Sequence, residues 1–231
     1  MKDNRIEEVL RSTYIFKDLP DKYIKLISSY FKTIRVRKGE VVFYQYDEST
    51  DFYIVLEGKL QAYISNEDGE DLVLAVFKSG DFFGEMSLFD GKPRSATVEA
   101  KEDSLLGVLS RNKFIDIVKQ NSSIALELLK IMVRRLREAD RMIEALAFFD
   151  VTDRLLMALV NLAKEEGEKL KEGGYRIKKR THKELASLAG SSREAVTKAI
   201  KALAFKKLIR QEGEYIYVSK EAEEKVESQF V

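Results

Sequence analysis

Between residues 39 and 108 the hydrophobic pattern is that of short strands. Runs of β-branched and aromatic residues alternate with turns that contain glycine. In one run Leu60, Ala62 and Ile64 alternate with residues such as Lys59 and Gln61, which is the two-residue period of a half-buried strand. Many short strands at close spacing predict a barrel or jelly roll. We expect strands over residues 41–44, 52–56, 60–64, 72–77 and 97–100, with a hairpin turn at the Asp-Gly pair of residues 68–69.

Helical patterns flank this region on both sides. The first thirty-odd residues predict short helices, the second of which starts at the Leu-Pro-Asp turn of residues 19–21. Residues 122–149 contain neither glycine nor proline and predict one long helix. Apolar residues recur along it at alternating steps of three and four, which predicts the seam of a coiled-coil homodimer. Packing of this stripe against the helix's own domain is the alternative. The predicted seam consists of Leu129, Met132, Leu136, Ala139, Ile143 and Leu146.

A second, smaller domain begins near residue 150. Its sequence pattern predicts a helix from residue 151 to about 170, followed by a Gly-Gly turn and two short helices. A hairpin is predicted over residues 208–218, with its turn at Glu212-Gly213. The fold class is therefore α+β, with an N-terminal β-roll. We expect a sensor domain over residues 1–120, a dimerisation helix over 121–149 and a winged helix-turn-helix over 150–231.

Two capping boxes mark the helix-turn-helix. The S/T-x-x-E pattern occurs at residues 181–184 and again at 191–194, so two helices are predicted to start ten residues apart. Between the starts, Ala186 is small enough for the helices to cross closely. Gly190 suits a left-handed turn, and Val196 packs the second helix onto the first.

The charge distribution supports nucleic-acid binding. The whole chain has a formal net charge of only +1, but residues 176–210 hold eleven lysines and arginines against two glutamates. A basic segment in a neutral chain is typical of a surface that binds nucleic acid. A merely solvated lysine-rich surface remains the alternative.

The second helix of the motif, residues 192–203, is predicted to enter the major groove of double-stranded DNA at a palindromic site. Arg193 can donate two hydrogen bonds to guanine, and Glu194 can accept one from cytosine N4. Phosphate contacts are expected from the helix starts, although His182 also suits an ordinary surface position. The predicted DNA-binding residues are Lys179, Thr181, His182, Lys183, Ser192, Arg193, Glu194, Thr197 and Lys198.

Composition excludes several classes of function. The chain has no cysteine, so it has no disulfide, structural zinc finger or cysteine-ligated iron–sulfur cluster. Its single histidine, His182, cannot form the imidazole clusters of a cupin-type metal enzyme, nor ligate haem in the barrel. We expect no catalytic residue and no metal site. No long apolar run or signal peptide is visible, so we expect a cytoplasmic protein that does not bind membranes.

One segment has the chemistry that a cyclic phosphate needs. Residues 80–89 read Gly-Asp-Phe-Phe-Gly-Glu-Met-Ser-Leu-Phe, and residues 93–97 read Pro-Arg-Ser-Ala-Thr. The glycines allow close approach of the backbone, and the amides that open a short helix can bind an anion. Arg94 can neutralise a phosphate, and Glu85 can accept a hydrogen bond from a ribose 2′-hydroxyl.

In these residues, and in residues 145–154, the chain resembles the family of the cyclic-AMP receptor protein and the fumarate–nitrate regulator. The second block resembles the family's hinge between the dimer helix and the DNA-binding domain. The resemblance implies a homodimer whose β-roll binds an effector, cyclic AMP or another cyclic nucleotide, with no cofactor. It also implies an activator or repressor, with RNA polymerase as a further partner. The pocket residues it implies are Leu74, Gly84, Glu85, Met86, Arg94, Ser95 and Arg135.

Two departures leave the effector open. Ala139-Asp140 stands where cyclic-AMP receptors carry a Thr-Ser pair that reads adenine, and Tyr46 stands where the family usually has glycine. A carboxylate at Asp140 only accepts hydrogen bonds, which favours the adjacent donors of guanine. Asp140 on the solvent side, paired with Arg137 or Arg141, is the alternative. A pocket that binds another ligand or none, with Arg94 merely tying a turn, also stays open.

Overall fold

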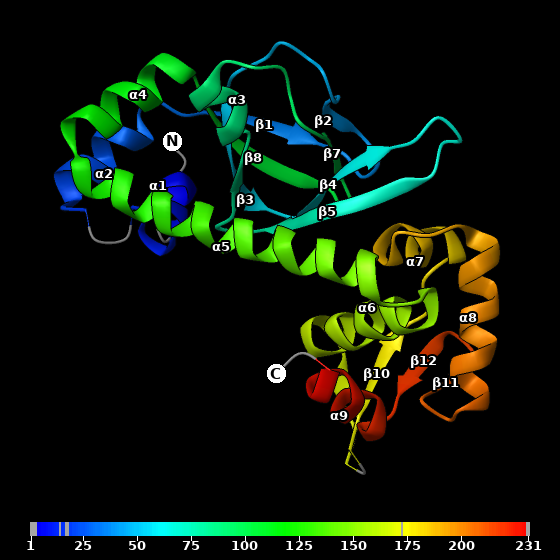
Figure 1. Cartoon of the computed structure of the whole chain (residues 1–231). Helices are drawn as coiled ribbons and strands as arrows, with labels where there is room; N and C mark the ends of the chain where they lie inside the picture. Colours follow the sequence, from blue (N-terminus) through cyan, green and yellow to red (C-terminus); the bar gives the residue numbers. More distant parts are fainter. Residues whose placement is uncertain (1–3, 14, 17–18, 172, 230–231) are drawn as a thin grey trace. The chain divides into compact units, whose positions relative to one another are not determined.

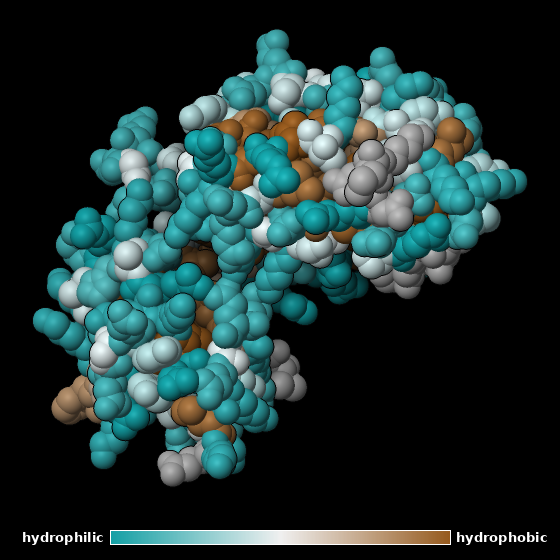
Figure 2. Space-filling view, turned by 180° about the vertical axis from the view of Figure 1, so that it is seen from behind, coloured by the Kyte–Doolittle hydropathy of each residue, from teal (hydrophilic) through white to brown (hydrophobic). Residues whose placement is uncertain are grey.

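The computed structural model describes residues 4–13, 15–16, 19–171 and 173–229 (Figure 1). The described chain divides into two compact units. One comprises the described residues within 1–64 and 74–138, with most of the β-roll, and the other comprises those within 65–73 and 139–229, with the C-terminal helices and their small sheet. Polar side chains cover most of the face in Figure 2, where hydrophobic residues reach the surface in separate patches. No described helix combines the length and the apolar character that crossing a bilayer requires.

The β-roll consists of two four-stranded sheets. The first has the order β1 (Lys32–Val36), β8 (Ser104–Leu109), β3 (Phe52–Glu57) and β6 (Phe82–Phe83). The second has the order β2 (Val41–Phe43), β7 (Thr97–Ala100), β4 (Lys59–Ser65) and β5 (Asp71–Lys78). The Asp-Gly hairpin between β4 and β5 is confirmed by a 3.1 Å hydrogen bond from the Gly69 amide to the Asn66 carbonyl.

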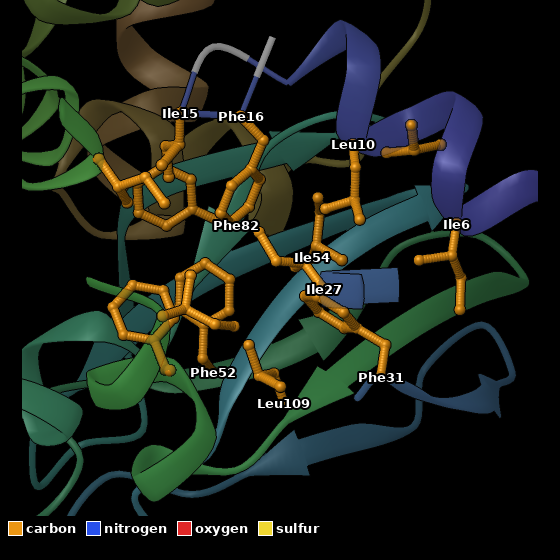
Figure 3. Close-up of a cluster of buried hydrophobic side chains, with 14 of the residues drawn as sticks. Ile6, Leu10, Ile15, Phe16, Ile27, Phe31, Phe52, Ile54, Phe82 and Leu109 are labelled. Atoms are coloured by element: carbon orange, nitrogen blue, oxygen red, sulfur yellow. The ribbon is translucent and has the colours of Figure 1, made fainter. Parts of the chain in front are cut away.

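Two apolar clusters hold this unit together. One lies between the sheets and includes stacked rings, with Tyr53 and Phe83 centroids 5.0 Å apart. The other joins the first sheet to α1 (Asn4–Ser12), α2 (Asp21–Ser28), α4 (Arg111–Gln120) and the start of α5 (Ser122–Phe148). Figure 3 shows this cluster, to which Phe52, Ile54 and Leu109 of the sheet and Leu10 and Phe16 of the N-terminal segment all belong.

The predicted α+β fold is confirmed, and the five predicted strands appear with small shifts at their ends. Three strands of the β-roll were not delimited by the pattern. Strand β1 exposes four of its five residues, so no apolar alternation marks it. Strand β6 has only two residues, and β8 is buried at five of its six positions, so no alternation is visible.

The second unit is a winged helix-turn-helix. Its core joins the long α6 (Val151–Glu166) to the two helices of the motif and to the inner face of the sheet. Helix α6 ends at Glu166, earlier than predicted, because β9 (Glu168–Lys169) follows it at once. The remaining elements are β10 (Tyr175–Lys178), α7 (His182–Ala189), α8 (Arg193–Phe205), β11 (Ile209–Glu212), β12 (Tyr215–Val218) and α9 (Lys220–Gln229), in a sheet of order β11-β12-β10-β9.

The turn between α7 and α8 follows the prediction in one half and departs from it in the other. Thr181 and Glu184 form the predicted capping box, and Gly190 ends α7 with a φ of +58°. The second predicted capping box is wrong, because Ser192 rather than Ser191 caps α8 and its hydroxyl accepts from the Ala195 amide. Two successive serines offered two possible caps, and the local pattern alone does not choose between them.

Candidate ligand-binding and DNA-binding sites

Arg94 is a buried arginine in the loop before β7. It is 1% exposed, and its guanidinium donates three hydrogen bonds within the chain. Nε donates to Ser49 Oγ at 2.8 Å, Nη1 to the Gly84 carbonyl at 3.0 Å, and Nη2 to the Asp51 carbonyl at 2.8 Å. The guanidinium carbon also lies 4.1 Å from the centroid of the Phe43 ring. Arg94 is therefore fixed in one position by two other segments of the β-roll.

Gly84 provides the space that this arginine occupies. It precedes α3 (Glu85–Asp90) with a φ of +84°. A Cβ atom at this position would lie 2.7 Å from both Nη1 of Arg94 and the Asp51 carbonyl oxygen, so no side chain fits. No side chain caps α3 among the described residues, which leaves its first backbone N–H groups available to an anion.

Burial changes the acid–base properties of this region. Removal from water lowers the pKa of the Arg94 guanidinium, while the nearby Tyr53 and Asp51 act in the opposite direction. Burial also raises the pKa of Tyr53, against the effect of the Arg94 charge. Since arginine stays protonated in proteins, the site presents a cation in a poorly hydrated environment. A phosphate that reached it would be attracted more strongly than at the surface.

Glu85 connects this turn to the long helix. It is 4% exposed, and its Oε1 accepts a 2.6 Å hydrogen bond from Nη1 of Arg135 on α5. Nη2 of Arg135 also donates to the Phe82 carbonyl, and the guanidinium lies 4.8 Å from the Phe82 ring centroid. The structure thus brings four of the predicted pocket residues together, namely Gly84, Glu85, Arg94 and Arg135.

The other predicted pocket residues lie nearer the surface. The Ser95 hydroxyl is 3.4 Å from Sδ of Met86, which is 55% exposed. Leu74 is an exposed residue of β5, and Asp140 is exposed on α5. The unusual Tyr46 has a φ of +73°, the conformation for which glycine is the ordinary choice, and its amide donates to the Arg94 carbonyl at 2.9 Å.

The apolar residues of α5 divide between two faces. Ile124, Leu128 and Ile131 are buried in the core of the sensor unit, and Met132 packs against that core as well. Met132 therefore faces the core of its own domain, at least in part, rather than only the predicted seam. Leu126 and Val133, which the predicted seam does not include, are exposed. The exposed stripe contains Leu126, Leu129, Val133, Leu136 and Ile143. Asp140 lies at the same spacing, four residues after Leu136 and three before Ile143, and is exposed as well.

The predicted DNA-binding side chains lie at the starts of α7 and α8. Lys179, Lys183, Arg193, Glu194 and Lys198 are all exposed, so their charges are accessible to a polyanion. Thr181 and Ser192 instead use their hydroxyl groups to cap the two helices. Their predicted phosphate contacts would therefore come from the backbone amides of the first turns.

His182 links the two helices of the motif. Its Nδ1 lies 2.8 Å from Oγ1 of Thr197, and that hydroxyl donates to the Arg193 carbonyl at 2.7 Å. Because the hydroxyl hydrogen is already used, Nδ1 is the donor in this pair, and Nε2 is the atom left for other contacts. The Thr197 hydroxyl is engaged inside the domain, which the sequence pattern did not indicate.

Comparison with known proteins matches both units. Residues 33–121 match the cyclic nucleotide-binding domain, and residues 153–223 match the Crp-like helix-turn-helix domain. The chain is 33% identical over 201 residues to the cyclic AMP receptor protein (CRP) of Thermus thermophilus, covering 87% of this chain and 90% of the relative. The chain belongs to the CRP family. It is a DNA-binding transcription regulator with a cyclic nucleotide-binding domain and a helix-turn-helix.

Other relatives and solved structures agree with this assignment. The cAMP-activated global transcriptional regulator CRP of Pasteurella multocida is 34% identical over 173 residues, covering 74% of this chain and 82% of that protein. The c-di-GMP responsive regulator CLP of Xanthomonas campestris matches with a TM-score of 0.76 and 26% identity, over 87% of this chain and 99% of CLP. These CRP-family members are described by different effectors, so family membership leaves the nucleotide open.

Proposed function

We propose that this CRP-family protein is a homodimer whose affinity for DNA is set by a cyclic nucleotide bound in the β-roll. The observation that carries the proposal is the contact between the ligand-binding turn and α5. Glu85 belongs to the turn, Arg135 belongs to the helix, and their hydrogen bond is 2.6 Å long. A ribose hydroxyl that donates a hydrogen bond to Glu85 would therefore contact a side chain that already accepts a hydrogen bond from the dimer helix. The proposed functional divisions are residues 1–120, 121–149 and 150–231.

We propose that the dimer forms through the exposed stripe of α5. An apolar stripe with a period of three and four residues on a single chain matches the requirement of a coiled-coil seam. Leu129, Leu136 and Ile143 are each at least 60% exposed, so the isolated chain leaves much apolar surface in water. The stripe also directs Asp140 toward the partner helix, between Leu136 and Ile143.

The partners that follow are double-stranded DNA and, for regulation, RNA polymerase. A two-fold dimer presents two copies of α8, which suits a palindromic site. The relatives are transcription regulators, and the proposal includes no catalytic reaction. The protein is expected to act in the cytoplasm, where bacterial DNA and RNA polymerase are found.

One specific observation favours a second candidate. Arg94 already has three acceptors within the chain, which suits a purely structural arginine as well as a phosphate ligand. In that case the protein is a CRP-family regulator that responds to another effector or to none. The guanidinium has further N–H groups, so an added phosphate contact does not require loss of these three bonds.

Isothermal titration calorimetry separates the two candidates. Cyclic AMP, cyclic GMP and cyclic di-GMP would be titrated into the wild type, Ser95→Ala, and Lys92→Ala. Lys92 is an exposed cation in the same loop, so its loss tests the effect of charge alone. We expect one of the three nucleotides to bind the wild type and Lys92→Ala with equal affinity. Its affinity for Ser95→Ala should be about tenfold lower, because one hydrogen bond to a phosphate contributes about 1.5 kcal/mol. No binding of any of the three would support the second candidate.

A further inference from the structure

Met86 is the most accessible of the methionines that the structure describes. It is 55% exposed, whereas Met132, Met142 and Met157 are half-buried. The chain has neither cysteine nor tryptophan, so no thiol or indole competes with the methionines for an oxidant such as hydrogen peroxide. Composition and exposure together make the Met86 thioether the side chain in the described part of the chain that such an oxidant should reach first.

The sulfur of Met86 already has a polar partner. The Ser95 hydroxyl, in the loop before β7, donates to Sδ over 3.4 Å. A thioether sulfur is only a weak acceptor, so a better acceptor could take this hydroxyl from it. Ser95 is exposed and is one of the predicted pocket residues, and a phosphate oxygen is such an acceptor. The sulfur and the expected phosphate therefore share one donor.

Oxidation of the sulfur would change the balance at this donor. In the reaction with hydrogen peroxide, a sulfur lone pair attacks one peroxide oxygen, an S–O bond forms, the O–O bond breaks and water leaves. The sulfur loses two electrons, which the peroxide gains. The product, methionine sulfoxide, is polar, and its oxygen accepts hydrogen bonds better than the thioether sulfur does. That oxygen would form beside the Ser95 hydroxyl and compete with the phosphate for it.

We propose that Met86 is a peroxide-sensitive modification site, at which sulfoxide formation occupies the Ser95 hydroxyl and weakens binding of the cyclic nucleotide. The modification is reversible. Methionine sulfoxide reductases remove the sulfoxide oxygen as water, while two thiols are oxidised to a disulfide. The effect on the nucleotide rests on the proposed function, whereas the oxidation of Met86 and its dependence on Ser95 do not.

Calorimetry before and after peroxide treatment tests the effect on binding. Full-length wild type, Met86→Leu, Ser95→Ala and Met157→Leu would be titrated with cyclic AMP, cyclic GMP and cyclic di-GMP, after removal of the peroxide. Leucine has a similar volume to methionine and no sulfur, and Met157→Leu, in α6, is the matched control. The ratio of affinities before and after peroxide is compared within each variant, so a different starting affinity does not affect the result.

We expect peroxide to lower the affinity of the wild type and of Met157→Leu about tenfold, the loss of one hydrogen bond to a phosphate. Met86→Leu and Ser95→Ala should show no loss, because the first forms no sulfoxide at this position and the second has no hydroxyl to lose. A tenfold loss in either of these two variants would overturn the proposal. An unchanged affinity in wild type whose Met86 is fully oxidised would overturn it as well.

Peptide mass spectrometry provides a second readout that needs no nucleotide. We expect the peptide with Met86 to gain the mass of one oxygen atom before the peptides with the three half-buried methionines do. Oxidation should be faster in Ser95→Ala, because the sulfur no longer accepts the hydroxyl. Oxidation of Met86 that is no faster than at the other three, or that does not respond to Ser95→Ala, would overturn the site. Selective, Ser95-dependent oxidation in a wild type that binds none of the nucleotides would refute the proposed effector and leave the site supported.

Discussion

Two arginines, Arg94 in the sensor unit and Arg193 in the DNA-binding unit, lie in opposite environments. In the sensor unit, Arg94 is 1% exposed and its guanidinium donates to three groups of its own chain. In the DNA-binding unit, Arg193 is exposed at the start of α8. A buried arginine has already lost its hydration and its conformational freedom, whereas an exposed arginine keeps both.

Under the proposed function, this difference follows from the size of the ligand that each site binds. A small anion offers few contacts, so its site must be preorganised and partly dehydrated before binding. DNA offers a long array of phosphates, and release of its counterions drives binding even to mobile surface cations. Substitution of Arg94 should therefore affect folding and ligand binding together. Substitution of Arg193 should affect DNA binding alone.

The largest expected effect concerns the exposed stripe of α5. Glutamates at both Leu136 and Ile143 would bury like charges across a two-fold axis, so we expect the double variant to be monomeric. Sedimentation velocity would measure the mass, with Leu26→Glu, an exposed leucine on α2, as the control. A dimer that persists in the double variant would show that the seam lies elsewhere.

The two arginines should differ in their contribution to the free energy of unfolding. We expect Arg94→Ala to lower the free energy of unfolding by about 3 kcal/mol, because buried carbonyls that lose a donor cost about 1–3 kcal/mol each. Arg193→Ala should change it by less than about 0.5 kcal/mol, as is usual for a surface position. Urea unfolding of both variants measures the difference. Equal losses would contradict the contrast between the two arginines.

Within the DNA-binding unit, base contacts and phosphate contacts should separate. Arg193→Ala should weaken binding by about 1–3 kcal/mol and relax the preference for one guanine in each half-site. Lys179→Ala should weaken binding to all sequences and reduce the salt dependence. Competition between specific and random duplexes, at several salt concentrations, measures both effects. A uniform loss in both variants would place Arg193 on a phosphate.

The cap at Asp150 has a smaller effect that depends on pH. Hydrogen bonds from the Asp153 and Thr152 amides lower the pKa of this carboxyl. A lowered pKa in the folded state adds stability above the unfolded pKa of about 4, and this stability is lost as the pH falls further. We expect Asp150→Ala to lose about 1 kcal/mol at pH 7 and progressively less below pH of about 4.

Asp150→Ser is the matched control, because serine also caps helices but does not titrate in this range. It should keep most of the stability, as measured by urea unfolding. A loss in Asp150→Ala that stays constant from pH 7 to about 3 would show that the cap bond does not depend on the charge.

The smallest expected effect is the choice of base. Asp140 lies on the stripe between Leu136 and Ile143, and its carboxylate can accept from guanine N1–H and N2–H₂ together. We expect Asp140→Ser to lower the ratio of cyclic GMP to cyclic AMP affinity, as measured by calorimetry. Glu138→Gln, on the same helix but off the stripe, should leave the ratio unchanged. An unaltered ratio in Asp140→Ser would make Asp140 an ordinary surface charge.

The sequence predicted most of the fold because its patterns are local. Strand alternation, the long helix without glycine or proline, and the cap at Thr181 are all determined within a few residues. Contacts between distant residues left no such pattern. Examples are Arg94 with Ser49, and Arg154 with Gly190, which join segments 45 and 36 residues apart.

The periodicity of α5 was ambiguous for a physical reason. This helix has two apolar faces, one packed on the sensor core and one exposed. The predicted seam combined residues of both faces, because it included Met132, which packs against the core. Exposure of Leu126 and Val133 separates the faces, and sequence alone gives no exposure. Part of the apolar spacing of α5 therefore belongs to the face that packs on the sensor core.

The central claim is that a nucleotide in the β-roll changes DNA binding by the other unit. Fluorescence anisotropy of a labelled palindromic duplex, titrated with the full-length protein, tests it most directly. We expect saturating cyclic GMP or cyclic AMP to raise the affinity at least about fivefold, and this gain should disappear in the dimer-breaking double variant. An affinity that is the same with and without both nucleotides would contradict the account.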